Sequence, residues 1–240
     1  EMAEELAAEE LHSEALAKIR TGNVYSVHFG VQTNIRRIKP IPGDREFYER
    51  IVTENRSFIR KTQKEIDKII QEEEIAVQKH RYLGRKIDAK SAYKVDQRFF
   101  TKKRNPEKVV DMAIAILVDN SGSMEGKRIE SAKEAAILLT EVLERMEIPV
   151  FVAGHNCESA LCFQIFKNFD TKYAKYSINR MLPGGDNRDG LALEIAGTFL
   201  TERQETNKLL IIISDGQPNS HGYSGELAKK DIKNIVKNYR

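Results

Sequence analysis

Cysteine, tryptophan and long apolar runs are scarce in this sequence of 240 residues. It has no tryptophan and two cysteines, Cys157 and Cys162, which are too widely spaced for a C-x-x-C motif and too few for a disulfide framework. No apolar run is long enough to span a bilayer, and the acidic N-terminus lacks the features of a signal peptide. We therefore expect a cytoplasmic protein with reduced thiols rather than a secreted, disulfide-stabilised one.

The chain also has no large excess of charge of one sign. Its net charge of +3 gives no reason to expect nucleic-acid binding. The basic residues are concentrated in residues 79–108, where eleven Lys and Arg accompany three Asp and Glu. We interpret this segment as a solvated, charge-rich surface, with docking against an acidic partner as the alternative.

The most informative segment is the loop that follows the apolar run Met112–Val118. Such a run is typical of a parallel strand buried on both faces, and open α/β sheets bind ligands at the carboxyl ends of their strands. The loop reads D-N-S-G-S over residues 119–123, so Asp119, Ser121 and Ser123 place oxygen atoms at alternate positions. Oxygen ligands suit a hard divalent cation such as Mg²⁺. For Ser123 alone, helix capping is the alternative.

Two catalytic motifs share this strand-to-helix position, and neither fits. A phosphate-binding P-loop needs Gly, four spacers and then Gly-Lys-Ser/Thr, whereas here Ser121 replaces the first Gly and Arg128 follows Lys127. A nucleophile elbow needs serine centred in G-x-S-x-G, whereas Ser123 directly follows Gly122. The chain shows no Ser/His/Asp or Cys/His arrangement either. We therefore expect a binding subunit that is not an enzyme in its own right and does not hydrolyse ATP.

Two later segments place more oxygen-bearing side chains at strand-to-helix turns. A second apolar strand, Leu209–Ile213, runs into S-D-G at residues 214–216. Between the two strands, residues 183–190 read P-G-G-D-N-R-D-G and precede a helix over residues 191–200. Either loop alone would be an ordinary turn or a helix start. Three such loops in this order favour one shared site at the carboxyl edge of the sheet.

Together the three loops resemble the metal-ion-dependent adhesion site of von Willebrand factor A (VWA) domains. The middle loop is similar to that of the NorD-type nitric oxide reductase activation proteins and of the CobT-type cobaltochelatase subunit, and the segment after Asp215 is most similar to the NorD type. The resemblance covers residues 81–240 well. It implies a bound Mg²⁺, Mn²⁺ or Ca²⁺, and it implies these metal ligands: Asp119, Ser121, Ser123, Asn187 and Asp215.

The middle loop departs from the family pattern at Asn187, where many of these domains have threonine. An asparagine oxygen is a neutral, hard donor and can serve as a ligand. The neighbouring Asp186 and Asp189 are alternative ligands. If either binds, a third carboxylate makes the ion a weaker Lewis acid toward the carboxylate of a partner.

The pattern of apolar residues predicts an α/β fold with an open, mainly parallel sheet flanked by helices, as in VWA and Rossmann-like domains. We assign residues 1–108 to a mostly helical region and residues 109–240 to the VWA domain. In the first region we expect a helix over 1–19, an extended segment over 24–38, a long helix over 44–80, an irregular basic segment over 81–108 and a short helix near 89–93. In the VWA domain we expect strands over 112–118, 149–154, 160–166 and 209–214, and helices over 127–146, 171–181, 191–204 and 225–239. Since the family fold continues beyond that last helix, we expect the final strands to be missing.

The resemblance implies an accessory subunit that acts with a MoxR-type AAA+ ATPase. Together the two proteins would activate a metalloenzyme such as nitric oxide reductase, or insert its metal, and the ion would bind an acidic residue of a partner. Two alternatives stay open: a subunit of a cobalt or magnesium chelatase complex, and a scaffold with a vestigial metal site. The sequence predicts neither nucleic-acid binding nor a membrane span.

Overall fold

A computed structural model describes residues 26–74, 78–81, 86–87, 100–102, 111–216 and 218–239. The chain forms two compact units, one made of Glu1–Arg56 with Asp111–Arg240 and the other of Ser57–Val110. The predicted division at residue 108 therefore lies close to one boundary of the larger unit. Residues 26–56, however, belong with the later domain rather than with the segment that follows them.

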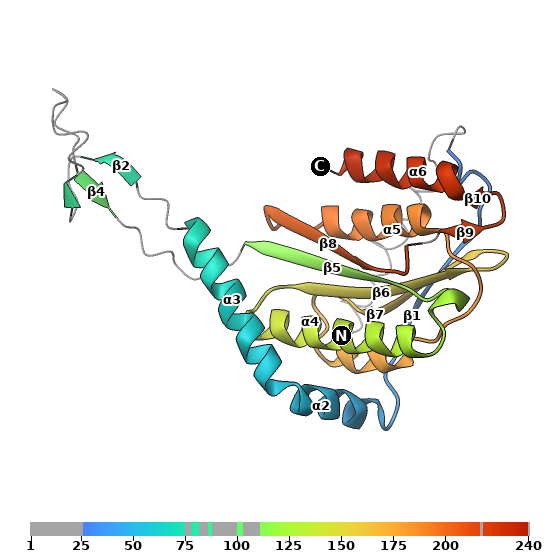
Figure 1. The fold of residues 1–240 in the computed structure, drawn as a ribbon, viewed down its shortest axis with the longest axis horizontal. Coiled ribbons are helices and arrows are strands. Elements are labelled where there is room, and N and C mark those ends of the chain that lie inside the picture. The colour runs from blue at the N-terminus through green and yellow to red at the C-terminus, as the bar shows by residue number, and fades with distance from the viewer. Residues whose placement is uncertain are drawn as a thin grey trace, which may run out of the picture. The chain divides into compact units, whose positions relative to one another are not determined.

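A five-stranded sheet forms the centre of the larger unit (Figure 1). Its strand order is β1-β7-β6-β5-β8, and every neighbouring pair is parallel except β6 and β7. The mainly parallel α/β architecture predicted from the sequence is thus confirmed. The strands are β1 (Thr33–Arg37), β5 (Met112–Asp119), β6 (Val150–Cys157), β7 (Leu161–Lys167) and β8 (Asn207–Ile213).

Helices cover both faces of this sheet (Figure 1). One face carries α4 (Lys127–Arg145), α2 (Asp44–Glu54) and the 3₁₀ helix η2 (Tyr173–Arg180), and the other carries α5 (Asp189–Thr201) and α6 (Gly225–Asn238). The helix predicted over 171–181 is therefore present, with 3₁₀ rather than α geometry. No helix in the described part of the chain is both long and apolar enough to span a membrane.

Buried apolar side chains lie on both faces of the sheet, and one large cluster packs the sheet against α5. The side chains of β5 are buried from Ala113 to Asp119, as expected for a strand covered on both faces. The ring of Phe151 in β6 stacks against Phe163, Phe169 and Phe199, with centroid distances of 6.5, 5.4 and 5.2 Å. This packing joins β6 to β7 and to α5, the helix that follows the middle loop.

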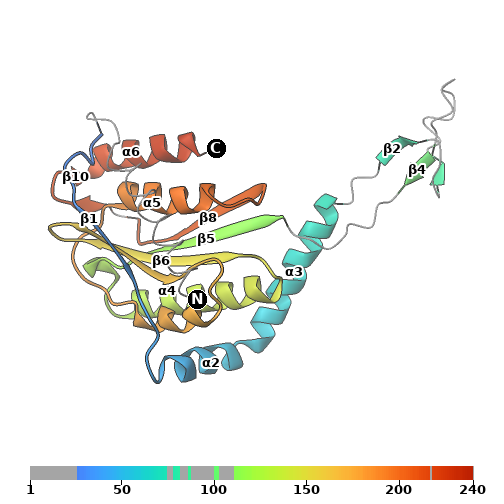
Figure 2. The same ribbon diagram turned by 180° about the vertical axis from the view of Figure 1, so that it is seen from behind.

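Strand β1 was not expected to join this domain. The predicted extended segment contains it, and it pairs in parallel with β7 so that Ile35 lies opposite Phe163. Figure 2 shows β1 in front of the other strands, at the edge of the sheet beyond β7. Because Ile35 packs against the apolar core, the strand is held by tertiary contacts that the local pattern does not reveal.

The long helix predicted over 44–80 is wrong in its continuity and its end. Helix α2 stops at Glu54, and the amide group of Asn55 caps it by donating to the carbonyl oxygen of Ile51 at 3.1 Å. Helix α3 (Arg56–Glu74) follows, and residues Gln78–Arg81 form a strand, β2. The backbone N–H of Asn55 donates to the same carbonyl oxygen at 3.1 Å, so the side chain adds a second donor at the residue that separates α2 from α3.

The smaller unit contains α3 and a three-stranded antiparallel sheet with the order β2-β4-β3. Its other strands are β3 (Lys86–Ile87) and β4 (Phe100–Lys102). The helices predicted over 1–19 and near 89–93 lie outside the described residues.

Candidate metal site

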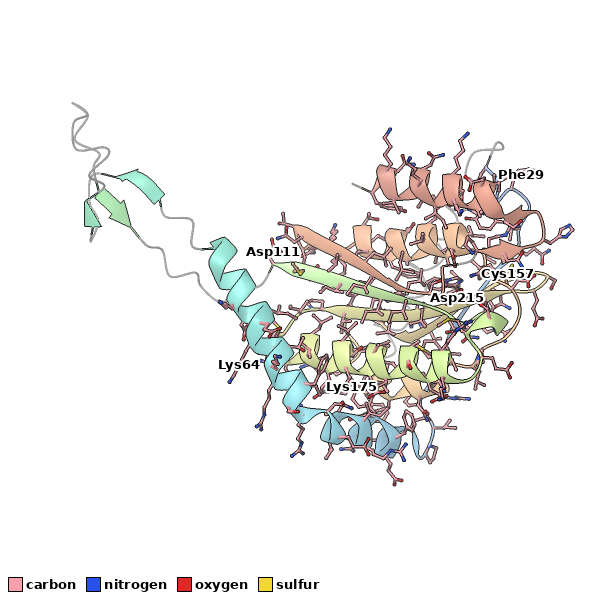
Figure 3. All side chains as sticks on the ribbon, in the orientation of Figure 1. Phe29, Lys64, Asp111, Cys157, Lys175 and Asp215 are labelled. Carbon is pink, nitrogen blue, oxygen red and sulfur yellow. The ribbon has the colours of Figure 1, made fainter. Side chains whose placement is uncertain are left out.

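The three predicted loops meet at the carboxyl edge of the large sheet. Strands β5 and β8 are parallel neighbours, so Asp119 at the end of β5 lies beside Ser214 and Asp215, which follow β8. Figure 3 shows Asp215 at the opposite end of the domain from Asp111, which precedes β5. Ligand sites of open α/β sheets form at this edge.

Asp119 connects all three loops through its carboxylate. It is fully buried, and its Oδ1 accepts the backbone N–H of Ser121 at 2.8 Å. Its Oδ2 accepts the Asn187 amide at 2.8 Å and the Ser214 hydroxyl at 3.1 Å. Ser214 was not predicted to take part in the site, although its position directly before Asp215 was a usable signal.

Ser121 and Ser123 present their hydroxyl groups side by side. Their Oγ atoms are 2.9 Å apart, close to the separation of about 3 Å between adjacent ligands of an octahedral Mg²⁺ with bonds of 2.0–2.1 Å. Neither serine caps helix α4, because the N-cap of that helix is Gly126. The capping interpretation of Ser123 is therefore wrong, and its hydroxyl is placed for another role.

Asn187 holds Asp119 in place. Its amide nitrogen donates to Asp119, while its Oδ1 accepts the backbone N–H of Asn219 at 2.6 Å. The oxygen that would bind an ion is thus directed toward β9 (Asn219–Ser220). A ligand role for Asn187 stays a prediction, and it requires the side-chain amide to rotate. In the observed orientation, the two hydrogen bonds of Asn187 position the Asp119 carboxylate.

Arg128 joins the first loop to the third. One of its terminal nitrogens donates to the Ser123 carbonyl oxygen at 2.7 Å and lies 3.4 Å from the Asp215 carboxylate. The Asp215 side chain is largely buried, whereas that of Arg128 is mostly exposed. The guanidinium supplies positive charge at the rim of a site that is otherwise rich in carboxylates.

The two alternative ligands of the middle loop have different environments. Asp186 pairs through its backbone with Cys157, with both N···O distances at 2.7 Å, and it is exposed to solvent. Asp189 is buried in the first turn of α5, and its Oδ1 has no hydrogen-bond partner among the described residues. Of these two residues, Asp189 is therefore the better placed to bind a metal ion.

Negative charge accumulates around Asp189. Burial, followed by the charges of Asp119 and Asp215, raises the pKa of its carboxyl group to about 7. Burial lowers the pKa of His155, whose Nε2 lies 3.4 Å from Asp189, to about 4, while the charge of Asp119 opposes that shift. The imidazole is therefore neutral at pH 7 and does not balance the negative charge of Asp119 and Asp189.

The donor set fits a small hard cation only when hydroxyl groups take part. No group of three or more His, Cys, Asp or Glu side chains in the described residues could hold a metal ion. The paired serine hydroxyls supply the missing oxygen donors, and the excess of carboxylate charge around Asp189 favours a cation.

We expect the variant Asp189→Asn to stabilise the metal-free protein in a pH-dependent way. Since the pKa of Asp189 is raised in the folded state, the folded state binds the proton more tightly, and stability falls as pH rises from about 4 to about 7. Asp189→Asn removes this loss, so its melting temperature in EDTA should exceed that of the parent at pH 8 and equal it at pH 4. Glu226→Gln, at a side chain 91% exposed, serves as the control and should match the parent at both pH values. An equal shift at pH 4 and pH 8 would refute the electrostatic explanation.

Comparisons with known proteins agree with this geometry. Residues 114–217 match the family profile described as von Willebrand factor type A domain. Protein YojO of Bacillus subtilis (strain 168) is 30% identical over 140 residues, which cover 52% of this chain and 21% of YojO. Protein NorD of Brucella abortus (strain 2308) is 29% identical over 136 residues, which cover 51% of this chain and 21% of NorD.

The chain spans about a fifth of the length of these two relatives. Among solved structures, the vWF domain of the type V pili tip protein Mfa5 from Porphyromonas gingivalis aligns with a TM-score of 0.38 at 19% identity, covering 45% of this chain and 38% of that one. The matched segment 114–217 contains all three loops of the candidate site. Residues 114–217 of this chain therefore form a segment that matches the von Willebrand factor type A domain.

Proposed function

We propose that the chain is a metal-dependent protein-binding subunit rather than a catalyst. Asp119, Ser121, Ser123 and Asp215 would hold Mg²⁺ or Mn²⁺, either directly or through water. The observation that supports this most is the pair of serine hydroxyls 2.9 Å apart beside the buried carboxylate that joins the three loops. The bound ion would supply a Lewis-acidic position that attracts a carboxylate of a partner protein.

The protein's own residues would prepare this position. Asn187 and Ser214 fix the Asp119 carboxylate by hydrogen bonds, and Arg128 joins the first and third loops. Because these contacts hold the donors in place before an ion binds, little reorganisation is needed on binding. The positive guanidinium of Arg128, mostly exposed, would also attract an acidic partner.

For the partners, we propose a MoxR-type AAA+ ATPase and a metalloenzyme client in the cytoplasm. The similarity to protein NorD supports this choice, and the ATPase would hydrolyse ATP while this chain recognises the client. Under this proposal the chain has no catalytic role of its own.

A calorimetric titration of the metal-stripped protein with Mg²⁺ and with Mn²⁺ tests the site. We expect saturable binding of one ion, and about tenfold weaker binding for Ser123→Ala because one of the paired hydroxyl donors is lost. The matched control is Ser131→Ala, which removes an exposed hydroxyl from α4 and should bind as the parent does. A parent protein that binds neither ion would overturn the proposal in favour of a scaffold.

A further inference from the structure

An open cavity lies on the α6 side of the sheet, beside the candidate metal site. It has a volume of about 620 Å³ and lies between α6, α5 and the carboxyl ends of β5, β6 and β8. Figure 1 shows α6 beside α5 on this face of the sheet. The apolar walls of the cavity are formed by Leu117, Leu193, Ile212, Ile232 and Val236. A volume of this size is typical of pockets for small molecules, which occupy roughly 300–1,000 Å³.

The outer rim of the cavity is basic. Lys229, Lys233 and Lys237 line it and are exposed, and Lys229 also pairs with Glu226 at 3.1 Å. Their spacing of four residues places them on one side of α6 over about 12 Å, at a rise of 1.5 Å per residue. An anionic group at the mouth of the cavity would therefore meet positive charge along its whole length.

The deep end of the cavity contains polar atoms without partners. His155 is fully buried and lines the cavity, and neither of its ring nitrogens has a hydrogen-bond partner among the described residues. Asp189 also lines the cavity, and its Oδ1 lies 3.4 Å from His155 Nε2 without forming a hydrogen bond. Buried polar groups are nearly always hydrogen-bonded in folded proteins, so the second ring nitrogen, His155 Nδ1, indicates where a ligand group would bind.

We propose that this cavity binds an elongated organic anion with three features. Its anionic head would pair with the lysines of α6, its apolar body would contact Ile212 and Val236, and a hydrogen-bonding group at its far end would reach His155. The ligand class follows from the cavity itself and does not depend on the metal-binding function proposed above. Because Ser214 and Asp189 belong to both sites, such a ligand would contact two of the three metal-site loops.

Calorimetric titration with 10-hydroxydecanoate in EDTA tests the assignment. We expect saturable binding by the parent protein, about tenfold weaker binding of decanoate, which lacks the distal hydroxyl, and about tenfold weaker binding of 10-hydroxydecanoate by Lys233→Glu. Lys230→Glu provides the matched control, because Lys230 is exposed on the same helix and does not line the cavity. It should bind as the parent does.

A second pair of variants tests the apolar body of the ligand. Ile212→Trp fills the cavity and should abolish binding, whereas Leu209→Trp, at an exposed position of the same strand outside the cavity, should not. Unchanged binding in Lys233→Glu and Ile212→Trp would overturn the proposal. Binding that occurs in Mg²⁺ but not in EDTA would also overturn the proposal, since a metal ion would then hold the carboxylate of the ligand. Equal affinities for decanoate and 10-hydroxydecanoate would rule out the contact with His155.

Discussion

Replacing Asp119 by alanine is expected to weaken Mn²⁺ binding by more than about 100-fold, which corresponds to about 2.7 kcal/mol. The Asp119 carboxylate hydrogen-bonds to residues of all three loops, through Ser121, Asn187 and Ser214. Its removal takes away a negative donor and also frees the groups that it aligns. The measurement is a calorimetric titration of the metal-stripped variant beside the parent.

The same variant should lose metal-dependent capture of the partner. A purified MoxR-type ATPase from the same organism should be retained by the immobilised parent in Mg²⁺ and released in EDTA, and Asp119→Ala should not retain it in either buffer. Glu226→Ala, which removes an exposed acidic residue of α6, is the control for charge and should behave as the parent does. Asp119→Asn keeps the shape of the side chain and separates loss of charge from loss of packing. Capture of the ATPase by Asp119→Ala at the parental level would disprove the metal-bridge mechanism.

The sequence was sufficient to predict the fold class because its strongest signals are local. The buried strand β5 and helices α4, α5 and α6 lie close to their predicted bounds, since each has a continuous apolar run or a helical repeat. The edge strand β1 is different. It is half-exposed and held by pairing with β7, and such long-range contacts leave little trace in a local pattern.

The candidate metal site was also only partly predictable from the sequence. The order of the three loops was enough to bring Asp119, Ser121 and Asp215 to one edge of the sheet. The roles of individual side chains were not predictable, because they depend on the direction of hydrogen bonds. Asn187 turns its oxygen toward Asn219, and Arg128 spans two loops only because α4 begins beside the third.

Gly154 is expected to be essential for the first loop, although a glycine within a strand is usually unfavourable. A Cβ atom at this position would overlap the side chain of Asn120, approaching its Cγ to 2.9 Å and its Oδ1 to 3.0 Å. Asn120 is fully buried, and its backbone is held on both sides, since its N–H donates to His155 and its carbonyl oxygen accepts from Gly184, both at 2.8 Å. Its backbone is therefore held in place, and relief of the overlap would require the buried side chain to move.

Gly154→Ala should accordingly lower the free energy of unfolding by about 1–3 kcal/mol, as overpacking of a core does. Thermal and urea unfolding in EDTA would measure this effect without a contribution from bound metal. Gly184→Ala is the matched control in a neighbouring loop, because its nearest contact to a new Cβ would be Asn156 at 3.8 Å, and we expect a change below about 0.5 kcal/mol.

The double variant Gly154→Ala/Asn120→Ala identifies the cause. Shortening Asn120 removes the overlap, but it also removes the long hydrogen bond of 3.5 Å from Asn120 Nδ2 to Gln164 Oε1. The single variant Asn120→Ala measures that separate cost. The double variant should be more stable than Gly154→Ala alone, with a coupling free energy of at least about 1 kcal/mol between the two sites. Additive effects would mean that the strand, and not the contact with Asn120, requires glycine. Since Asn120 lies between Asp119 and Ser121, recovery of Mn²⁺ affinity in the double variant would show that this contact also shapes the metal site.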